Sequence, residues 1–255
     1  MSPYWYTYFV LGLFLLLDRC DAYINHDANL ARLFNRNWRT PVYTYLIYLA
    51  GALFLDIFIG GYIGNMWVYP HFDLTERFIN VIIIGYPLAF FSCAIFYRIL
   101  SKLFKIFSGT IAQDNDNAPL SFRNLGIIIL FITIISTCFP IGYCLIFGMK
   151  NIQLIIIICS LTGIFSISPL SLILGQKCLL RGILCKDWST IMALLISIPM
   201  NACAHELPNT FAWEWRYQNM PLPSLEILGV PVIVLTIGWT YLTIFGISAN
   251  ELFFQ

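Results

Sequence analysis

Charge is scarce in this sequence: 11% of its 255 residues are Asp, Glu, Lys or Arg, whereas 59% are hydrophobic. A soluble domain of this length carries about 25% charged residues. The formal net charge is +1, and no large basic patch is present, which argues against nucleic acid as a partner. The composition therefore predicts a membrane protein whose partners are membrane lipids.

Metal-binding and phosphate-binding residues are equally few. The three histidines, His26, His71 and His205, cannot form a multi-histidine di-iron site, and the zinc motif HExxH is absent. The sequence has no glycine-rich phosphate-binding loop and no Asp-rich helix pair for magnesium and a diphosphate. The last apolar run lacks the lysine that a retinal Schiff base requires. We expect no metal and no cofactor.

The sequence contains several long apolar runs. Crossing about 30 Å of hydrocarbon takes roughly 20 apolar residues in a helix, and seven windows meet or approach this length. The fold prediction is an all-α integral membrane protein, a seven-helix bundle within one transmembrane domain, 1–255. The first window has no basic n-region and no small-residue cleavage site, so we expect a retained helix. The windows are 4–17, 42–63, 79–98, 126–148, 153–174, 187–207 and 227–248.

The basic residues predict the orientation of this bundle. Loops 18–41 and 99–125 carry four each, counting Arg98 at the edge of the second, and loop 175–186 carries three. The alternate loops carry one each. By the positive-inside rule, the N-terminus lies outside and the C-terminus inside. The bacterial inner membrane and the endoplasmic reticulum both fit this multi-pass topology, and the oligomeric state stays open.

Repeated motifs indicate an internal duplication. Each half of the chain has an acid, then a Trp-x-Tyr motif, then a Gly-x-Pro element that opens an apolar run. The offset of four helices predicts a parallel 3+1+3 repeat, with units 1–98 and 153–248 and a connecting helix 126–148. The elements are Asp56, Trp67-Val68-Tyr69 and Gly85-Tyr86-Pro87 in the first half, and Glu206, Trp215-Arg216-Tyr217 and Gly229-Val230-Pro231 in the second.

This topology places both acids, both aromatic loops and both Gly-x-Pro elements on the outer side of the membrane. We expect the prolines to lie in the outer turns of their helices and to kink them, because proline removes a helical hydrogen bond. The expected result is one cavity shared by the two halves.

Three acids are the candidate catalytic residues. A carboxylate at bilayer depth costs about 2.5–3.5 kcal/mol, so such a residue suggests a function. Asp56 has no basic residue within a helical turn, so we expect it to be protonated near neutral pH and to act as a general acid. Glu206 and Glu214 are candidates for the second acid or base. Glu214 faces the cavity only if the helix continues past Pro208.

Each acid also has a structural interpretation. Asp56 can serve as a hydrogen-bond partner between helices, Glu206 can be solvated at the membrane surface, and Glu214 can be a loop carboxylate beside Arg216. The aromatic residues likewise allow two interpretations. They are either a belt at the membrane interface or a lining that binds substrate and stabilises positive charge. The predicted substrate-binding residues are Trp67, Tyr69, Trp213, Trp215 and Tyr217.

Together these motifs resemble those of the membrane carotenoid and terpenoid cyclase and hydratase superfamily. That superfamily includes heterodimer-type lycopene cyclases, bacterioruberin hydratases and fungal meroterpenoid cyclases. The stretch 209–217 resembles the Asn-x-Ala-Trp-Glu-x-x-Tyr segment of the fungal cyclases, with one extra residue after Asn209. The stretch 250–254 resembles the Glu-Glu-x-x-Phe-Phe segment of the lycopene cyclases, without its second acid.

The resemblance implies cofactor-free acid catalysis on a lipophilic isoprenoid, as in a membrane terpene cyclase, an isomerase or lyase of carotenoid biosynthesis. A carboxylic acid, here Asp56, would protonate an alkene or epoxide. Aromatic rings would then shield the cation until cyclisation, proton loss or water capture. Two non-enzymatic alternatives stay open: a small transporter, and a docking or assembly factor that uses the outer aromatic loops.

Overall fold

The computed structural model of the protein describes residues 5–25, 37–61, 65–108, 120–147, 167–220 and 225–253. These residues are mostly helical. The helices are α1 (Trp5–Asn25), α3 (Arg39–Phe54), α4 (Leu74–Glu76), α5 (Tyr86–Ser108), α6 (Leu120–Phe147), α8 (Ile167–Ile173), α9 (Leu179–Leu184), α10 (Trp188–Ala212) and α11 (Trp239–Phe253). The π-helical segments are η1 (Leu55–Gly61), η2 (Arg77–Gly85) and η3 (Val234–Gly238). The strands are β1 (Trp67–Val68), β2 (Arg216–Tyr217), β3 (Glu226–Ile227) and β4 (Val230–Pro231).

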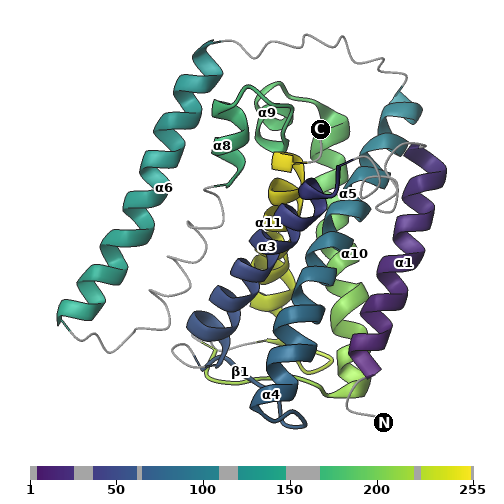
Figure 1. Ribbon diagram of the computed structural model, residues 1–255, viewed down its shortest axis with the longest axis vertical. Helices are drawn as coiled ribbons and strands as arrows, with labels where there is room; N and C mark the ends of the chain where they lie inside the picture. Colours follow the sequence, from purple (N-terminus) through teal and green to yellow (C-terminus); the bar gives the residue numbers. More distant parts are fainter. Residues whose placement is uncertain are drawn as a thin grey trace.

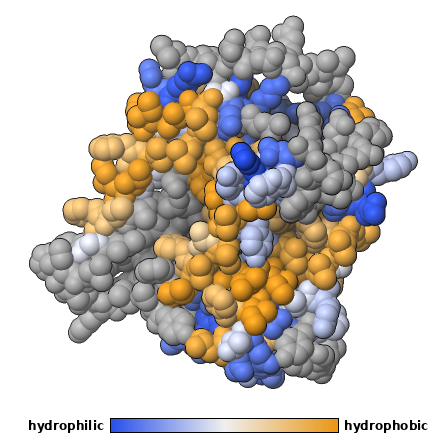
Figure 2. Space-filling model, in the orientation of Figure 1, coloured by the Kyte–Doolittle hydropathy of each residue, from blue (hydrophilic) through white to orange (hydrophobic). Residues whose placement is uncertain are grey.

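Three helical stretches in the described part of the chain are long and apolar enough to cross a membrane: Arg39–Ile57, Leu74–Ser108 and Trp188–Ala212. A shorter apolar stretch, Ser121–Ser136, lies within α6. The prediction of a mostly helical, membrane-type protein is therefore confirmed. The count of seven helices stays a prediction, because most of window 153–174 lies outside the described residues. Figure 2 shows apolar side chains over much of the middle of the drawn face, with polar side chains toward its two ends.

Helix α5 occupies the centre of the bundle, where it contacts α1, α3, α10 and α11 (Figure 1). Tyr48, Phe90 and Phe245 form the aromatic core between α3, α5 and α11. Gly246 lets α11 approach α5 closely, since a Cβ there would lie 2.7 Å from the Phe90 carbonyl oxygen. Helix α6 stands to one side and contacts α8, where Gly126 lies against Ile173.

The two ends of the bundle are built differently. The N-terminus, α4 and β1 lie at one end, and the C-terminus and α9 lie near the other (Figure 1). At the α9 end, Arg98 of α5 forms an ion pair with Asp21 of α1 and donates a hydrogen bond to Asn250 of α11. These contacts join three helices at that end. A cavity lies at the opposite end of the bundle, where β1 is found.

The two Gly-x-Pro elements adopt different structures. Gly85 ends η2 and Pro87 follows in α5, so this element is helical but lies within the continuous stretch Leu74–Ser108, beyond the first turns where it was expected. The same expectation is wrong for Gly229 and Pro231, which lie in the hairpin β3–β4 ahead of η3. Leu228 and Gly229 both have positive φ, 54° and 77°, as a two-residue type I′ hairpin turn requires. The short strands also make the protein not purely α-helical.

Candidate functional site

A cavity of about 180 Å³ lies among the residues of α1, α5, α10, α11 and the strands β1 and β2. Most of its wall is aliphatic or aromatic. Six of the eight predicted site residues line it: aromatic residues from both halves of the chain meet here, together with the two acids of the second half. The acidic and aromatic lining residues are Tyr6, Trp67, Tyr69, Tyr86, Phe90, Glu206, Glu214, Trp215, Tyr217, Trp239 and Tyr241.

Strand pairing brings the two Trp-x-Tyr motifs together. Strands β1 and β2 are antiparallel, with Trp67 opposite Tyr217, and the two rings meet edge to face with centroids 6.5 Å apart. The indole edge of Trp67 packs on Gly60, where an added Cβ would lie 2.1 Å from the ring. The glycine in η1 therefore determines where Trp67 sits in the cavity wall.

Glu206 lies near the end of α10 and is 3% exposed. Its Oε1 accepts hydrogen bonds from the Tyr217 hydroxyl at 2.7 Å and from Trp239 Nε1 at 3.0 Å. Its Oε2 is buried and has no hydrogen-bond partner among the described residues. Two donors thus hold Oε1 in place, whereas Oε2 accepts no hydrogen bond from the part of the chain that the structure describes. The two donors fix the orientation of the carboxyl at the cavity wall.

Glu214 reaches the cavity because α10 continues past Pro208 to Ala212. Trp213 then adopts a left-handed conformation with φ 55°, and the chain turns back. Asn209 holds this turn through two hydrogen bonds of 3.1 Å to the backbone of Trp215. The Glu214 carboxyl is 2% exposed and accepts the backbone N–H of Tyr6.

The environment of Glu214 favours its neutral form. Burial raises the pKa of Glu214 from 4.5 to about 7, and the hydrogen bond from the Tyr6 backbone opposes this increase. A carboxyl with a pKa near neutral can both donate and accept a proton at physiological pH. Glu214 is therefore suited to proton transfer at the cavity wall.

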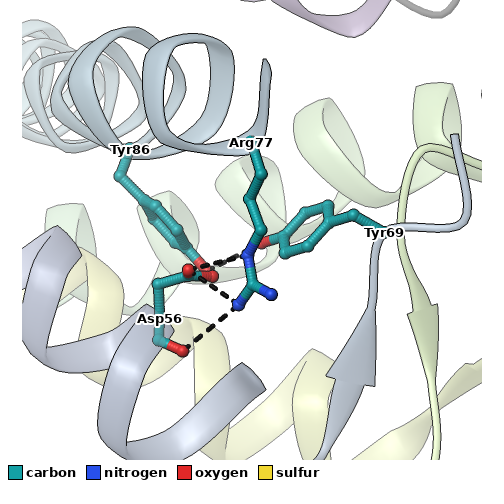
Figure 3. Close-up of polar contacts among 4 residues, drawn as sticks. All are labelled: Asp56, Tyr69, Arg77 and Tyr86. Atoms are coloured by element: carbon teal, nitrogen blue, oxygen red, sulfur yellow. Dashed lines mark hydrogen bonds and ion pairs between the residues drawn. The ribbon is translucent and has the colours of Figure 1, made fainter. Parts of the chain in front are cut away.

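Asp56 has an ionic partner, so the expectation of an unpaired carboxyl is wrong. The Arg77 side chain lies 2.7 Å from Asp56 Oδ2, and its Nε donates to the same oxygen at 2.8 Å (Figure 3). Arg77 is far along the sequence but begins η2, which packs close enough to η1 for the two side chains to meet. Asp56 is also not among the described residues that line the cavity.

The Asp56–Arg77 pair lies next to tyrosines that line the cavity. The Arg77 guanidinium lies 4.9 Å from the centroid of the Tyr69 ring, and the Tyr69 and Tyr86 hydroxyls are 3.3 Å apart (Figure 3). Tyr69 and Tyr86 both line the cavity. The pair therefore contacts Tyr69 through Arg77, and Tyr69 in turn contacts Tyr86.

Tyr6 and His205 belong to the site although the sequence did not predict them there. The Tyr6 hydroxyl lies 2.6 Å from His205 Nδ1, and the Tyr6 ring meets Trp215 edge to face at 4.5 Å. His205 stacks on Trp239 with ring centroids 4.9 Å apart. Tyr6 lies in an apolar window that predicts only a helix. Its phenol within an apolar run is the one local feature that marks it.

Trp213 lies apart from the other predicted aromatic residues. It is 50% exposed, and the Arg216 guanidinium lies 4.0 Å from its ring centroid. It is not among the described lining residues. The left-handed turn at Trp213 sends its side chain outward while Glu214 and Trp215 turn inward. Its exposed position fits the alternative interpretation as an interfacial aromatic residue.

The described residues contain no group of three or more His, Cys, Asp or Glu side chains placed to hold a metal ion. No protein-family model, curated protein or solved structure matches this chain.

Proposed function

We propose that the protein is a membrane enzyme that cyclises or hydrates a lipophilic isoprenoid by cofactor-free acid catalysis. The observation that carries this proposal is the pair of buried carboxyls, Glu206 and Glu214, in a cavity otherwise lined by aliphatic and aromatic groups. Within the described residues neither carboxyl forms a salt bridge. An apolar cavity with a few convergent polar groups is typical of a small-molecule site.

The proposal assigns proton donation to Glu206 and not to Asp56. In its neutral form Glu206 gives its proton to one carbon of an alkene: the O–H bond breaks, a C–H bond forms from the π electrons, and the neighbouring carbon becomes cationic. With an epoxide, the proton goes to the oxygen and a C–O bond breaks. Oε1 stays bonded to Tyr217 and Trp239 during this step, which keeps the carboxyl oriented.

Glu214 is the proposed base that completes the reaction. In cyclisation, a second alkene attacks the cation, and loss of a proton from a neighbouring carbon to a carboxylate gives the neutral product. In hydration, water attacks the cation and loses a proton to the same carboxylate. Either route returns one proton to the site for each proton donated. The pKa of about 7 at Glu214 matches this exchange at neutral pH.

Aromatic rings are the proposed stabilisers of the cation. Trp67, Tyr86, Trp215 and Tyr217 line the cavity together with the two acids. A cation over such a ring gains about 0.5–2 kcal/mol, with the larger values in desolvated sites. The rings also exclude water, which would otherwise capture the cation before cyclisation.

The proposed setting is a seven-helix, multi-pass bundle with the N-terminus outside, the C-terminus inside and a 3+1+3 repeat. The pairing of β1 with β2 supports the repeat, because an antiparallel strand pair has local two-fold symmetry and here joins the two Trp-x-Tyr motifs. The Tyr217 hydroxyl binds Glu206, and Tyr69 contacts Arg77, the partner of Asp56. Each motif thus lies beside the acid of its own half.

The test is expression in cells that supply linear isoprenoids, followed by mass-resolved analysis of extracted lipids. We expect a product that is isomeric with its substrate or heavier by one water. Glu206→Gln should abolish it and Glu214→Gln should reduce it strongly. The matched control is Glu226→Gln, because Glu226 lies in exposed strand β3 and does not line the cavity.

An unchanged lipid profile is the result that would contradict the proposal. A lipid profile that is identical for the wild type and both variants, with all proteins folded, would overturn the proposed chemistry. It would favour the transporter or the docking factor. A product lost in Glu226→Gln as well would show that the loss does not report on the cavity.

A further inference from the structure

His205 is a buried imidazole that lies beside the site without lining the cavity. It is fully buried on α10, and it is not among the described residues of the cavity wall. The next residue, Glu206, does line the cavity. Successive side chains on a helix point about 100° apart. Helix α10 therefore directs Glu206 to the cavity and His205 to a different side.

One face of the imidazole contacts a hydrogen-bond donor to Glu206. The rings of His205 and Trp239 are stacked, with centroids 4.9 Å apart and planes 11° apart. Trp239 Nε1 donates to Oε1 of Glu206 at 3.0 Å. Because the stack fixes the plane of the indole, it also fixes the direction of this N–H group. His205 is thus one contact away from the oriented oxygen of Glu206.

The imidazole also contacts the residue that donates to Glu214. The Tyr6 hydroxyl lies 2.6 Å from His205 Nδ1, and the two rings meet edge to face with centroids 6.0 Å apart. Tyr6 lies in the first turn of α1, and its backbone N–H donates to the Glu214 carboxyl. The contact between Tyr6 and His205 therefore holds the start of α1 against α10.

The contacts form one continuous chain from acid to acid, which runs through α10, α11 and α1. His205 is at its middle. Its other ring nitrogen, Nε2, is buried and has no hydrogen-bond partner among the described residues. Within that part of the chain, the Tyr6 hydroxyl and the indole stack are what hold the imidazole in place. The order of the contacts is Glu206, Trp239, His205, Tyr6 and Glu214.

We infer that His205 is a positioning residue that fixes the two acids of the site relative to each other. It acts through Trp239 on Glu206 and through Tyr6 on Glu214. The inference rests on the proposed function, because the acids that it positions are the proposed proton donor and base. The two contacts use different properties of the imidazole, its flat ring and its polar nitrogen, so substitutions can separate them.

Two variants separate the contacts. His205→Phe keeps a flat ring for the stack on Trp239 but has no polar atom for the Tyr6 hydroxyl. His205→Asn keeps a polar group near the position of Nδ1 but has no ring for the stack. We expect the first variant to disturb Glu214 and the second to disturb Glu206.

The experiment is nuclear magnetic resonance on the full chain in lipid nanodiscs, with no substrate present. The indole N–H signal of Trp239, assigned with Trp239→Phe, reports the hydrogen bond to Glu206. The carboxyl carbon signal of Glu214, assigned with Glu214→Gln, is titrated with pH. We expect His205→Asn to move the Trp239 signal toward that of an indole without an acceptor. We expect His205→Phe to raise the pKa of Glu214 further above about 7, because the bond from Tyr6 opposes the effect of burial.

The controls show whether these changes are specific to His205. Cys203→Ala should change neither signal, because Cys203 is exposed on the same helix and does not line the cavity. Both signals moving together in both His205 variants, or neither moving in either, would overturn the inference. Tyr6→Phe should match His205→Phe, and the double variant should add nothing. Tyr6→Phe decides the question if the His205 variants do not fold, since an unchanged Glu214 titration there would also overturn it.

Turnover gives a second measurement, and it separates this inference from the proposed function. Each His205 variant should lower kcat about tenfold and leave KM within about twofold, because the acids are misplaced while the cavity wall is kept. A raised KM with unchanged kcat would contradict a positioning role. Separate signal changes without any acid-dependent product would overturn the chemistry and keep the positioning. An acid-dependent product with no separation of the signals would do the reverse.

Discussion

The hydroxyl of Tyr217 donates a hydrogen bond to Oε1 of Glu206 at 2.7 Å. This contact connects strand β2, which pairs with β1 from the other half of the chain, to the end of α10. The same Tyr217 hydroxyl accepts a hydrogen bond from Trp215 Nε1 at 3.0 Å. The position of the Glu206 carboxyl therefore depends on a strand pair formed by distant segments.

Tyr217→Phe tests this dependence. Loss of the hydroxyl leaves Oε1 with Trp239 as its donor, so we expect turnover to fall about ten- to a hundredfold through misorientation of the carboxyl. Stability should fall by about 1 kcal/mol. The measurements are product formation in lipid extracts and thermal unfolding in detergent. Tyr23→Phe is the control, because Tyr23 is 83% exposed; equal losses in both variants would rule out a specific role for Tyr217.

Asp56→Asn tests the assignment of Asp56 to structure. The substitution leaves the Arg77 guanidinium without its ionic partner in a site where Asp56 is 1% exposed. We expect a loss of about 3 kcal/mol in unfolding free energy, because removal of one partner from a buried pair is strongly destabilising. The double variant Asp56→Asn, Arg77→Gln should recover part of this loss. Abolished turnover with unchanged thermal unfolding would instead make Asp56 the proton donor.

The pKa of Glu214 predicts a pH-dependent stability. The pKa is about 7 in the folded protein, against 4.5 as its ordinary value. Between these values the folded state keeps a proton that the unfolded state releases, so stability falls as pH rises from about 4.5 to about 7. Glu214→Gln removes this contribution. The unfolding temperature of the variant should therefore change less than that of the wild type between pH about 4.5 and about 7. Parallel curves for wild type and variant would contradict the raised pKa.

Tyr6→Phe separates two roles of one residue. The variant loses the hydroxyl bonded to His205 Nδ1 but keeps the backbone N–H that binds Glu214. We expect a loss of about 1–3 kcal/mol, because a buried ring nitrogen of His205 is left without its partner. Thermal unfolding in detergent measures this loss. Tyr8→Phe is the control in the same helix, since Tyr8 is 69% exposed; a similar loss there would show that the His205 contact is not the cause.

The sequence predicted the parts of the site that depend on local patterns. Apolar runs predicted the membrane-type helices, and the Trp-x-Tyr motifs pointed to Trp67 and Tyr217, which the strands place opposite each other. The continuation of the helix past Pro208 was left open, because proline at an interior position usually ends or kinks a helix. The structure continues it to Ala212, which brings Glu214 to the cavity.

Other parts of the site had no local signal. Arg77 is not within a helical turn of Asp56 in sequence, so local sequence patterns do not predict the pair. Trp213 and Trp215 share the same short motif, yet the left-handed turn at Trp213 separates an exposed ring from a lining one. Tyr6 contacts three members of the site from a different helix.

The sequence by itself determined that the chain is helical, strongly apolar and carries a few acids within or beside its apolar runs. Hydropathy and helical propensity are local properties, so composition and short windows suffice for them. Only the tertiary structure decided that Asp56 is paired with Arg77 and that Glu206 and Glu214 face a common cavity. Whether a buried carboxyl is paired depends on contacts between segments far apart in the chain, and those contacts exist only once the helices have packed.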